Sequence, residues 1–269
     1  MTGSTLRVAL AQTASTTDVS ANLHRMRAAC GTAAERGARL TVFPEFAMAK
    51  HADLTVEALA QAEAVDGGFA QDVSRMAREH GQTVVAGMLE RDGEDVFNTL
   101  VAFDASGDLV ATYRKVHLYD AYGQRESDRL RAGDPASVAT IDLGDVRVGL
   151  LTCYDLRFPE SARLHADAGV ELLLYPANWV PGENKRLHWT TLARARAIEN
   201  TLYVAAVSQA PPTGIGTSVL FDPAGLEVVS LGDEPGVVVA DVSSRRVETV
   251  REVNPSLDNR RFDVVARTV

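Results

Sequence analysis

The 269-residue sequence contains only two cysteines, Cys30 and Cys153. Cys30 falls on the apolar face of an expected helix, where a free cysteine packs as a small hydrophobic residue. The two thiols therefore do not predict a disulfide framework. A reactive thiol suits a reducing compartment, so we expect a cytoplasmic protein.

Long apolar runs and basic clusters are also missing. No segment approaches the roughly 18 apolar residues of a membrane span, and residues 1–7 lack the basic and apolar regions of a signal peptide. The formal net charge is −9, from 27 Lys and Arg against 36 Asp and Glu, and no basic stripe offsets it. We therefore expect neither a membrane nor a nucleic acid as a partner.

No Pro/Gly/Ser-rich linker, charge block or internal repeat divides the chain, so we expect one domain over residues 1–269 with an extended C-terminal tail at about 253–269. Apolar and β-branched runs predict strands at residues 6–11, 39–43, 83–89, 97–103, 109–115, 138–142, 146–152, 171–176, 202–208, 217–222, 226–231 and 236–241. Helical periodicity predicts helices at residues 19–36, 67–80, 158–168, 186–199 and from 243 onward. This pattern alone predicts an α/β or α+β fold.

Cys153 lies where an expected strand, residues 146–152, gives way to a helix. The polar segment after it, with Pro159 just inside, is typical of the turn into a helix. Unpaired amides and the helix dipole at such a turn favour the thiolate, the nucleophilic form of cysteine. Cys153 is therefore a candidate nucleophile, and the alternative is a small buried hydrophobic residue.

Two other strand ends carry charged residues. Glu45 follows the expected strand at 39–43, and ligands collect at strand ends in open α/β sheets, so we expect it to point into a cleft. The alternative is a surface glutamate. Lys115 ends a hairpin strand, and the alternative there is an edge lysine that prevents aggregation. His117 would share the strand face of Lys115 and is a further candidate for lining the same site.

Glu45, Lys115 and Cys153, in this order and at this spacing, resemble the Glu-Lys-Cys triad of the nitrilase superfamily of carbon–nitrogen hydrolases, in its smaller amidase-type members. The resemblance covers nearly the whole chain. The segment 153–160 is most similar to the branch that contains omega-amidases and deaminated-glutathione amidases. Further matching blocks lie at residues 6–12, 123–128, 175–179, 188–189, 194–200 and 254–261.

The resemblance implies a four-layer α-β-β-α sandwich, in which helices flank two packed mixed sheets. We assign Cys153 as the nucleophile that forms a thioester, and Glu45 as the general base, which works best with a pKa raised by burial. Lys115 and the backbone N–H of Tyr154 would stabilise the oxyanion. Glu126 is implied as an additional positioning residue. No metal or cofactor is required.

The expected reaction is hydrolysis of a small-molecule carboxamide to a carboxylate and ammonia. Arg157 should border the pocket mouth, where its guanidinium would hold a substrate carboxylate. The alternative for Arg157 is a structural ion pair with Asp155 or Glu160. The resemblance also implies that Asn178 and Trp179 contact the substrate.

Other readings stay open. Gly216-Thr217-Ser218 departs from the Gly-His-Ser of the amidase branch, so the pocket rim and the substrate could differ. An N-carbamoyl amino acid hydrolase or a true nitrilase is an alternative within the enzyme class, and a catalytically idle binding scaffold is the alternative outside it. The resemblance further implies a homodimer or a larger homo-oligomer, built on the apolar segment after Cys153 and on the tail from Val253.

Overall fold

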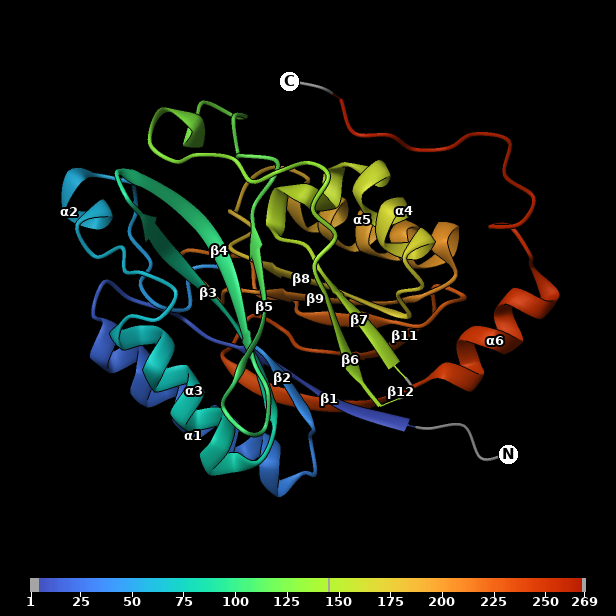
Figure 1. Ribbon diagram of the computed structural model, residues 1–269, viewed down its shortest axis with the longest axis horizontal. Coiled ribbons are helices and arrows are strands. Elements are labelled where there is room, and N and C mark those ends of the chain that lie inside the picture. The colour runs from blue at the N-terminus through green and yellow to red at the C-terminus, as the bar shows by residue number, and fades with distance from the viewer. Residues whose placement is uncertain (1–4, 145, 268–269) are drawn as a thin grey trace.

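The computed structural model describes residues 5–144 and 146–267. Residues 1–4 of the segment examined for a signal peptide, and the last two residues of the expected tail, lie outside the described residues. The described chain forms two six-stranded sheets that pack face to face (Figure 1). The first has the order β12-β1-β2-β3-β4-β5 and the second the order β11-β10-β9-β8-β7-β6.

The strands of the first sheet are β1 (Thr5–Gln12), β2 (Leu40–Val42), β3 (Thr83–Asp92), β4 (Asp95–Phe103), β5 (Leu109–Arg114) and β12 (Gly236–Ser243). Those of the second are β6 (Thr140–Leu143), β7 (Val146–Leu150), β8 (Leu172–Ala177), β9 (Tyr203–Ser208), β10 (Val219–Phe221) and β11 (Glu227–Ser230). The central strands β1, β2 and β3 are parallel, as are β7, β8 and β9, and the flanking pairs are antiparallel. Both sheets are therefore mixed.

The inner faces of the sheets share one apolar core. The core cluster joins Val8 and Leu10 of β1 with Leu150 of β7 and Leu174 of β8. Strands β8 and β9 are buried at every position, as expected for parallel strands that are covered on both faces. Removing this apolar surface from water is the main force that holds the two sheets together.

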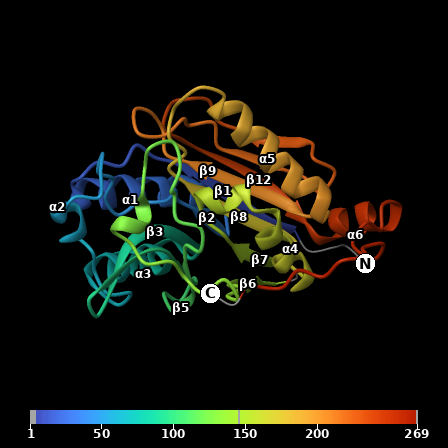
Figure 2. The same cartoon turned by 90° about the horizontal axis from the view of Figure 1, so that it is seen from above.

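Helices cover the outer face of each sheet (Figures 1 and 2). Two pack on the first sheet and two on the second, so the four-layer α-β-β-α sandwich is confirmed. Local chemistry sets the helix ends, since Asp18 caps the first helix by accepting a hydrogen bond from the Ala21 N–H. The helices are α1 (Val19–Glu35) and α3 (Gly68–His80) on the first sheet, α4 (Pro159–Asp167) and α5 (Lys185–Asn200) on the second, and the shorter α2 (Val56–Leu59) and α6 (Ser244–Val253).

The structure has each element that the periodicity predicts, with ends shifted by a few residues. It adds α2 and two 3-10 helices, at Glu126–Asp128 and Cys153–Arg157. After α6 the chain has no helix or strand over residues 254–267, up to the last described residue. In the described parts of the chain, no helix has the length and apolarity that a membrane crossing needs.

Candidate active site

Three chain segments that follow strands bring Glu45, Lys115 and Cys153 together. Glu45 follows β2, Lys115 follows β5 and Cys153 follows β7. Glycine at position 87 of β3 allows the loop with Glu45 to approach, because a Cβ there would lie 2.8 Å from the Glu45 Cα and 2.7 Å from the Phe46 nitrogen. The prediction that Glu45 points into a cleft is confirmed, since it lines a cavity together with Lys115 and Cys153.

Lys115 links two carboxylates. Its Nζ donates hydrogen bonds of 2.8 Å to Glu45 Oε1 and 2.8 Å to Glu126 Oε2. The other oxygen of Glu45, Oε2, accepts the backbone N–H of Asn178 at 2.7 Å. Glu45 and Lys115 are each 1% exposed and Glu126 is 8% exposed, so water screens these charges little.

The local turn differs from the one predicted for Cys153. Cys153 opens the 3-10 helix Cys153–Arg157 instead of standing at the N-terminus of α4. The reason is a capping box, in which Thr152 and Asp155 satisfy each other's backbone N–H groups, while Pro159 starts α4 separately. Cys153 itself has a φ of 45°, in the left-handed region that non-glycine residues seldom adopt. Such strained residues cluster at active sites.

The charge states also differ from expectation. The pKa of the Cys153 thiol is raised well above its usual value by burial and by the Glu45 carboxylate, so the resting thiol is protonated. Burial acts to raise the pKa of Glu45, but the Lys115 ammonium and the hydrogen bonds that Glu45 accepts outweigh it and lower the net pKa. Burial acts to lower the pKa of Lys115, yet Glu126 and Glu45 raise it well above normal. A thiolate favoured by the helix dipole and a base with a raised pKa were thus wrong predictions.

The cavity in front of Cys153 has a volume of about 460 Å³. Its wall includes Glu126 and Asn178, as predicted, but also residues that the sequence analysis did not single out. The sequence signal for Lys50 is weak, a lysine five positions after Glu45, and Tyr119 lies between the predicted strands at 109–115 and 138–142. The further lining residues with polar or aromatic side chains are Phe46, Lys50, His51, Asp53, Thr55, Tyr119, Gln124, Arg125, Asp128 and Arg129.

A small side cavity extends from Cys153 past Tyr119 and Asn178 to Trp179 and Lys185. Trp179 is nearly buried, and its Nε1 donates to the Lys185 carbonyl at 2.9 Å. The Oδ1 atom of Asn178 is buried and, among the described residues, has no hydrogen-bond partner. A substrate group that donates a hydrogen bond would satisfy it.

Arg157 is not among the residues that line the catalytic cavity. Its guanidinium lies 4.9 Å from the centroid of the Trp179 ring and makes a 3.4 Å contact with His188 Nδ1. In the described chain it forms no ion pair with Asp155 or Glu160. Asp155 instead accepts hydrogen bonds from Tyr113 Oη and from the backbone of His117, so His117 belongs to a structural network beside the site.

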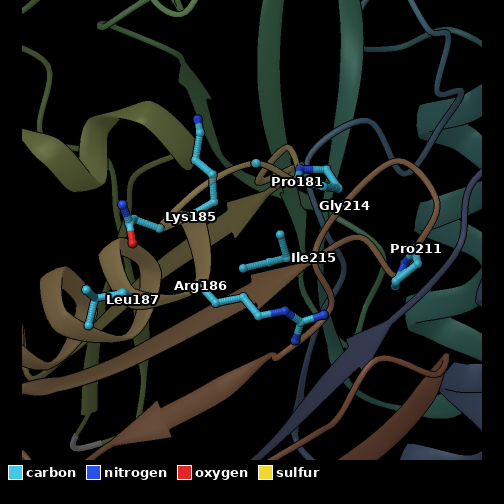
Figure 3. A pocket seen from close by; sticks show the side chains of 9 residues that line it. Pro181, Lys185, Arg186, Leu187, Pro211, Gly214 and Ile215 are labelled. Atoms are coloured by element: carbon cyan, nitrogen blue, oxygen red, sulfur yellow. The ribbon is translucent and has the colours of Figure 1, made fainter.

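A second pocket, of about 480 Å³, lies where α5 begins (Figure 3). Its wall is mainly apolar and includes Pro181, Leu187, Pro211 and Ile215. None of Glu45, Lys115 and Cys153 lines this pocket. Among residues 5–144 and 146–267, no group of three or more His, Cys, Asp or Glu side chains is arranged to hold a metal ion.

A family model described as Carbon-nitrogen hydrolase matches residues 7–252. The chain belongs to this family. A protein of Mycobacterium tuberculosis, named only a hydrolase, is 41% identical over 264 residues, which are 92% of each chain. The deaminated glutathione amidase of Escherichia coli O157:H7 is 38% identical over 234 residues, 86% of this hydrolase and 87% of that enzyme.

A solved structure of an amidase from Nesterenkonia, of the nitrilase superfamily, superposes with a TM-score of 0.83 at 30% identity and covers 97% of this chain and 96% of that one. Another structure of that amidase carries acrylamide added to its active-site cysteine. The resemblance to the amidase branch of the nitrilase superfamily is therefore confirmed, and this protein is a carbon–nitrogen hydrolase.

Proposed function

We propose that this hydrolase cleaves small-molecule carboxamides through a thioester on Cys153 and releases ammonia and a carboxylate. The observation that carries the proposal is the buried Lys115 ammonium, held at 2.8 Å from Glu45 beside the thiol in a cavity of small-molecule size. The amidase names of the relatives support the amide as the bond that is cut. The acrylamide adduct of the Nesterenkonia amidase supports a reactive cysteine at the equivalent centre.

Acylation begins with a neutral thiol and an ionised base. As the Cys153 sulfur attacks the amide carbon, its proton passes to the Glu45 carboxylate, and the S–C bond forms while the carbonyl oxygen becomes an oxyanion. An ammonium has three N–H donors, and Lys115 uses two on Glu45 and Glu126, so one is left for the oxyanion. The backbone N–H of Tyr154 would be the second donor.

Ammonia leaves and water completes the cycle. The C–N bond breaks as protonated Glu45 returns its proton to the amide nitrogen, which departs as ammonia. Water then loses a proton to Glu45 while its oxygen attacks the thioester carbon. Glu45 returns that proton to the Cys153 sulfur as the S–C bond breaks, which restores the thiol and releases the acid. Glu45 serves as base and acid in both halves, and Glu126 holds the Lys115 ammonium in place between them.

We propose Lys50 as the residue that meets an anionic group of the substrate. It lines the catalytic cavity, is half-buried, and lies 5.4 Å from the centroid of the Phe46 ring. Burial lowers its pKa, and in the described chain no carboxylate lies within ion-pair distance of it. A half-buried ammonium without a carboxylate partner is a favourable site for a substrate carboxylate. Contact by Arg157, the earlier expectation, stays a prediction.

Ammonia release from a panel of primary amides, nitriles and N-carbamoyl amino acids tests the activity. We expect turnover of primary amides and none by Cys153→Ala. Preference for a carbamoyl amino acid or a nitrile would move the enzyme to that class, and a folded protein inactive on the whole panel would leave only a binding scaffold.

Monoamides of dicarboxylic acids, compared with neutral amides of equal length, test the anion site. Loss of one charged hydrogen bond, worth roughly 1.5–3 kcal/mol, should lower kcat/KM of Lys50→Met about 10- to 100-fold on the dicarboxylate amide and little on the neutral one. Arg157→Ala is the matched variant. If Arg157→Ala shows the selective loss and Lys50→Met does not, Arg157 is the anion contact.

We also propose that the enzyme works in the cytoplasm and as a homodimer. Cys30 and Cys153 are both free, and a reducing compartment keeps a catalytic thiol available. Fractionation of cells of the source organism that express the tagged protein tests the compartment. We expect the protein in the soluble cytoplasmic fraction. Recovery from the culture medium or the envelope fraction would contradict it.

A further inference from the structure

Asn98 contacts both carboxylates beside the thiol and the backbone of Lys115. It lies in β4 and is 1% exposed. Its Nδ2 donates to Glu45 Oε1 at 2.7 Å and to Glu126 Oε1 at 3.1 Å. Its backbone carbonyl accepts the Lys115 N–H at 2.8 Å. The Asn98 side chain thus bridges the carboxylates of Glu45 and Glu126, which are 81 positions apart in the sequence.

The orientation of the Asn98 amide is fixed by these carboxylates. Turning the amide over would place Oδ1 against two carboxylate oxygens, where acceptor faces acceptor. In the orientation observed, Oδ1 is buried and finds no partner among the described residues. A buried orphan acceptor is unfavourable, so the two bonds from Nδ2 outweigh that loss.

The charge around Asn98 explains why a neutral donor is needed there. Glu45 and Glu126 share one ammonium, that of Lys115, while the Cys153 thiol is neutral and Lys50 acts from a greater distance. Two buried carboxylates near each other favour uptake of a proton by one of them. The two N–H groups of Asn98 offset that tendency without adding a charge.

We propose that Asn98 is a positioning residue, which holds the side chains of Glu45 and Glu126 around the Lys115 ammonium and keeps Glu45 ionised, so that Glu45 is ready to take the thiol proton. This role rests on the proposed function for its effect on turnover. Its effect on the charge state of the two carboxylates does not depend on which substrate is cleaved, and the two can be measured separately.

The first measurement uses the free enzyme. Carbon-13 NMR of labelled glutamate carboxyls, assigned with Glu45→Gln and Glu126→Gln, follows their titration. In Asn98→Leu, similar in size but without a donor, the Glu45 carboxyl should titrate about one pH unit or more higher than in the wild type, since a unit corresponds to a tenfold change in the protonation equilibrium. Thr99→Val is the control, because Thr99 is buried next to Asn98 and donates to Glu90 instead.

The second measurement is the pH profile of kcat/KM on an amide that the wild type cleaves. The acid limb of Asn98→Leu should move to higher pH, and kcat should fall about tenfold or more with a smaller change in KM. Asn98→Asp donates only while its new carboxyl is protonated, so its activity relative to the wild type should rise as the pH falls. Thr99→Val should keep the wild-type profile whatever stability it loses.

These outcomes decide the proposal. Carboxyl titrations that do not shift in folded Asn98→Leu would overturn the proposal, even if activity fell. A residue with only a structural role would lower activity without shifting the titration. If Asn98→Leu does not fold, Asn98→Ser replaces it, since the shorter hydroxyl cannot reach both carboxylates and should shift the titration in the same direction. A shifted titration in an enzyme that cleaves no amide would uphold Asn98 and refute the proposed function.

Discussion

At the scale of single residues, we propose that Cys153 is a nucleophile whose thiol is protonated at rest, and that the Glu45 carboxylate is its base. Burial of the thiol and, after it, the Glu45 charge raise the pKa of Cys153, whereas the Lys115 ammonium acts in the opposite direction. In the proposed mechanism the thiolate therefore forms when the proton moves to Glu45 during attack, and not beforehand. This arrangement protects the thiol from unspecific chemistry, because only the thiolate is strongly nucleophilic.

Alkylation by iodoacetamide tests this arrangement. Peptide mapping should find the label at Cys153 and not at Cys30, whose pKa burial raises to about 12. The rate at Cys153 should keep rising with pH above 9.0, the ordinary thiol pKa. Glu45→Gln removes the carboxylate charge that helps to raise the pKa of Cys153. Alkylation at pH 8 should therefore be faster than in the wild type, while turnover is lost. Labelling of Cys30 with Cys153 untouched would contradict the assignment.

Substitution of Lys115 should affect both rate and stability. Loss of an oxyanion donor costs roughly 10²–10³ in kcat, and a buried pair broken on one side costs roughly 3–5 kcal/mol of unfolding free energy. The lowered pKa of Glu45 stabilises the fold above its unfolded pKa and loses that effect as the pH falls through the folded value. The raised pKa of Lys115 stabilises below its unfolded pKa and loses that effect as the pH rises through the folded value.

Urea unfolding of Lys115→Ala, followed across pH together with ammonia release, measures both effects. The stability difference from the wild type should be largest near neutral pH and shrink toward acid pH, where Glu45 takes up a proton. A variant with normal kcat would exclude Lys115 as an oxyanion donor, and a difference independent of pH would exclude the ion pair as the cause of lost stability.

The strand ends make Glu45, Lys115 and Cys153 candidates, and the resemblance to the Glu-Lys-Cys triad of the nitrilase superfamily joins them into one site. Lys50 has no such local pattern, since only the fold brings its loop over the cavity. For Asn98 the sequence signal is a polar residue within the apolar strand β4. The charge states could not be predicted, because they depend on distances between side chains from separate strands.

At the scale of elements, the sharp turns decide where the side chains point. Periodicity predicted the strand β7 and the helix α4, but not the 3-10 helix between them, because the capping box of Thr152 and Asp155 is a contact between side chain and backbone. The pattern also could not show that β3 must carry a glycine where the loop with Glu45 crosses it.

Gly87→Ala tests that crossing. A methyl group at residue 87 would lie 2.7–2.9 Å from backbone atoms of residues 44–46, so the Glu45 loop must move. Since a misplacement of about 1 Å can cost about 10² in rate, kcat should fall by that order, with reduced thermal stability. Gly31→Ala is the control: it lies in α1 with its nearest neighbour at 3.6 Å, and alanine should stabilise the helix by roughly 0.5–1 kcal/mol. Full activity in Gly87→Ala would show that the loop tolerates displacement.

At the scale of the whole molecule, we propose that residues 1–269 form one domain, because both sheets contribute to one core cluster. Calorimetry should show a single transition. Val8→Ala in the first sheet and Leu174→Ala in the second should lower the same transition temperature. That temperature should fall by roughly 2–4 °C for each kcal/mol of stability lost. Two transitions, of which each variant moved only one, would divide the chain into two domains.

The last prediction concerns assembly. Phe262 and Val265 in the tail are 87% and 82% exposed, and Leu187 and Ile198 on α5 are 62% and 45% exposed. Contiguous exposed apolar surface marks sites that another chain covers, and we propose that these residues belong to such surfaces.

We expect a homodimer in which each such surface is used twice about a two-fold axis. Light scattering at micromolar concentration should give twice the chain mass, and Phe262→Glu combined with Val265→Glu should shift it toward the monomer, because each pair of charges enters the interface twice. Leu109→Glu, at an exposed position of the edge strand β5, is the matched control and should remain dimeric. A monomeric wild type would refute the interface, and a double variant that stays dimeric would place it elsewhere than at the tail.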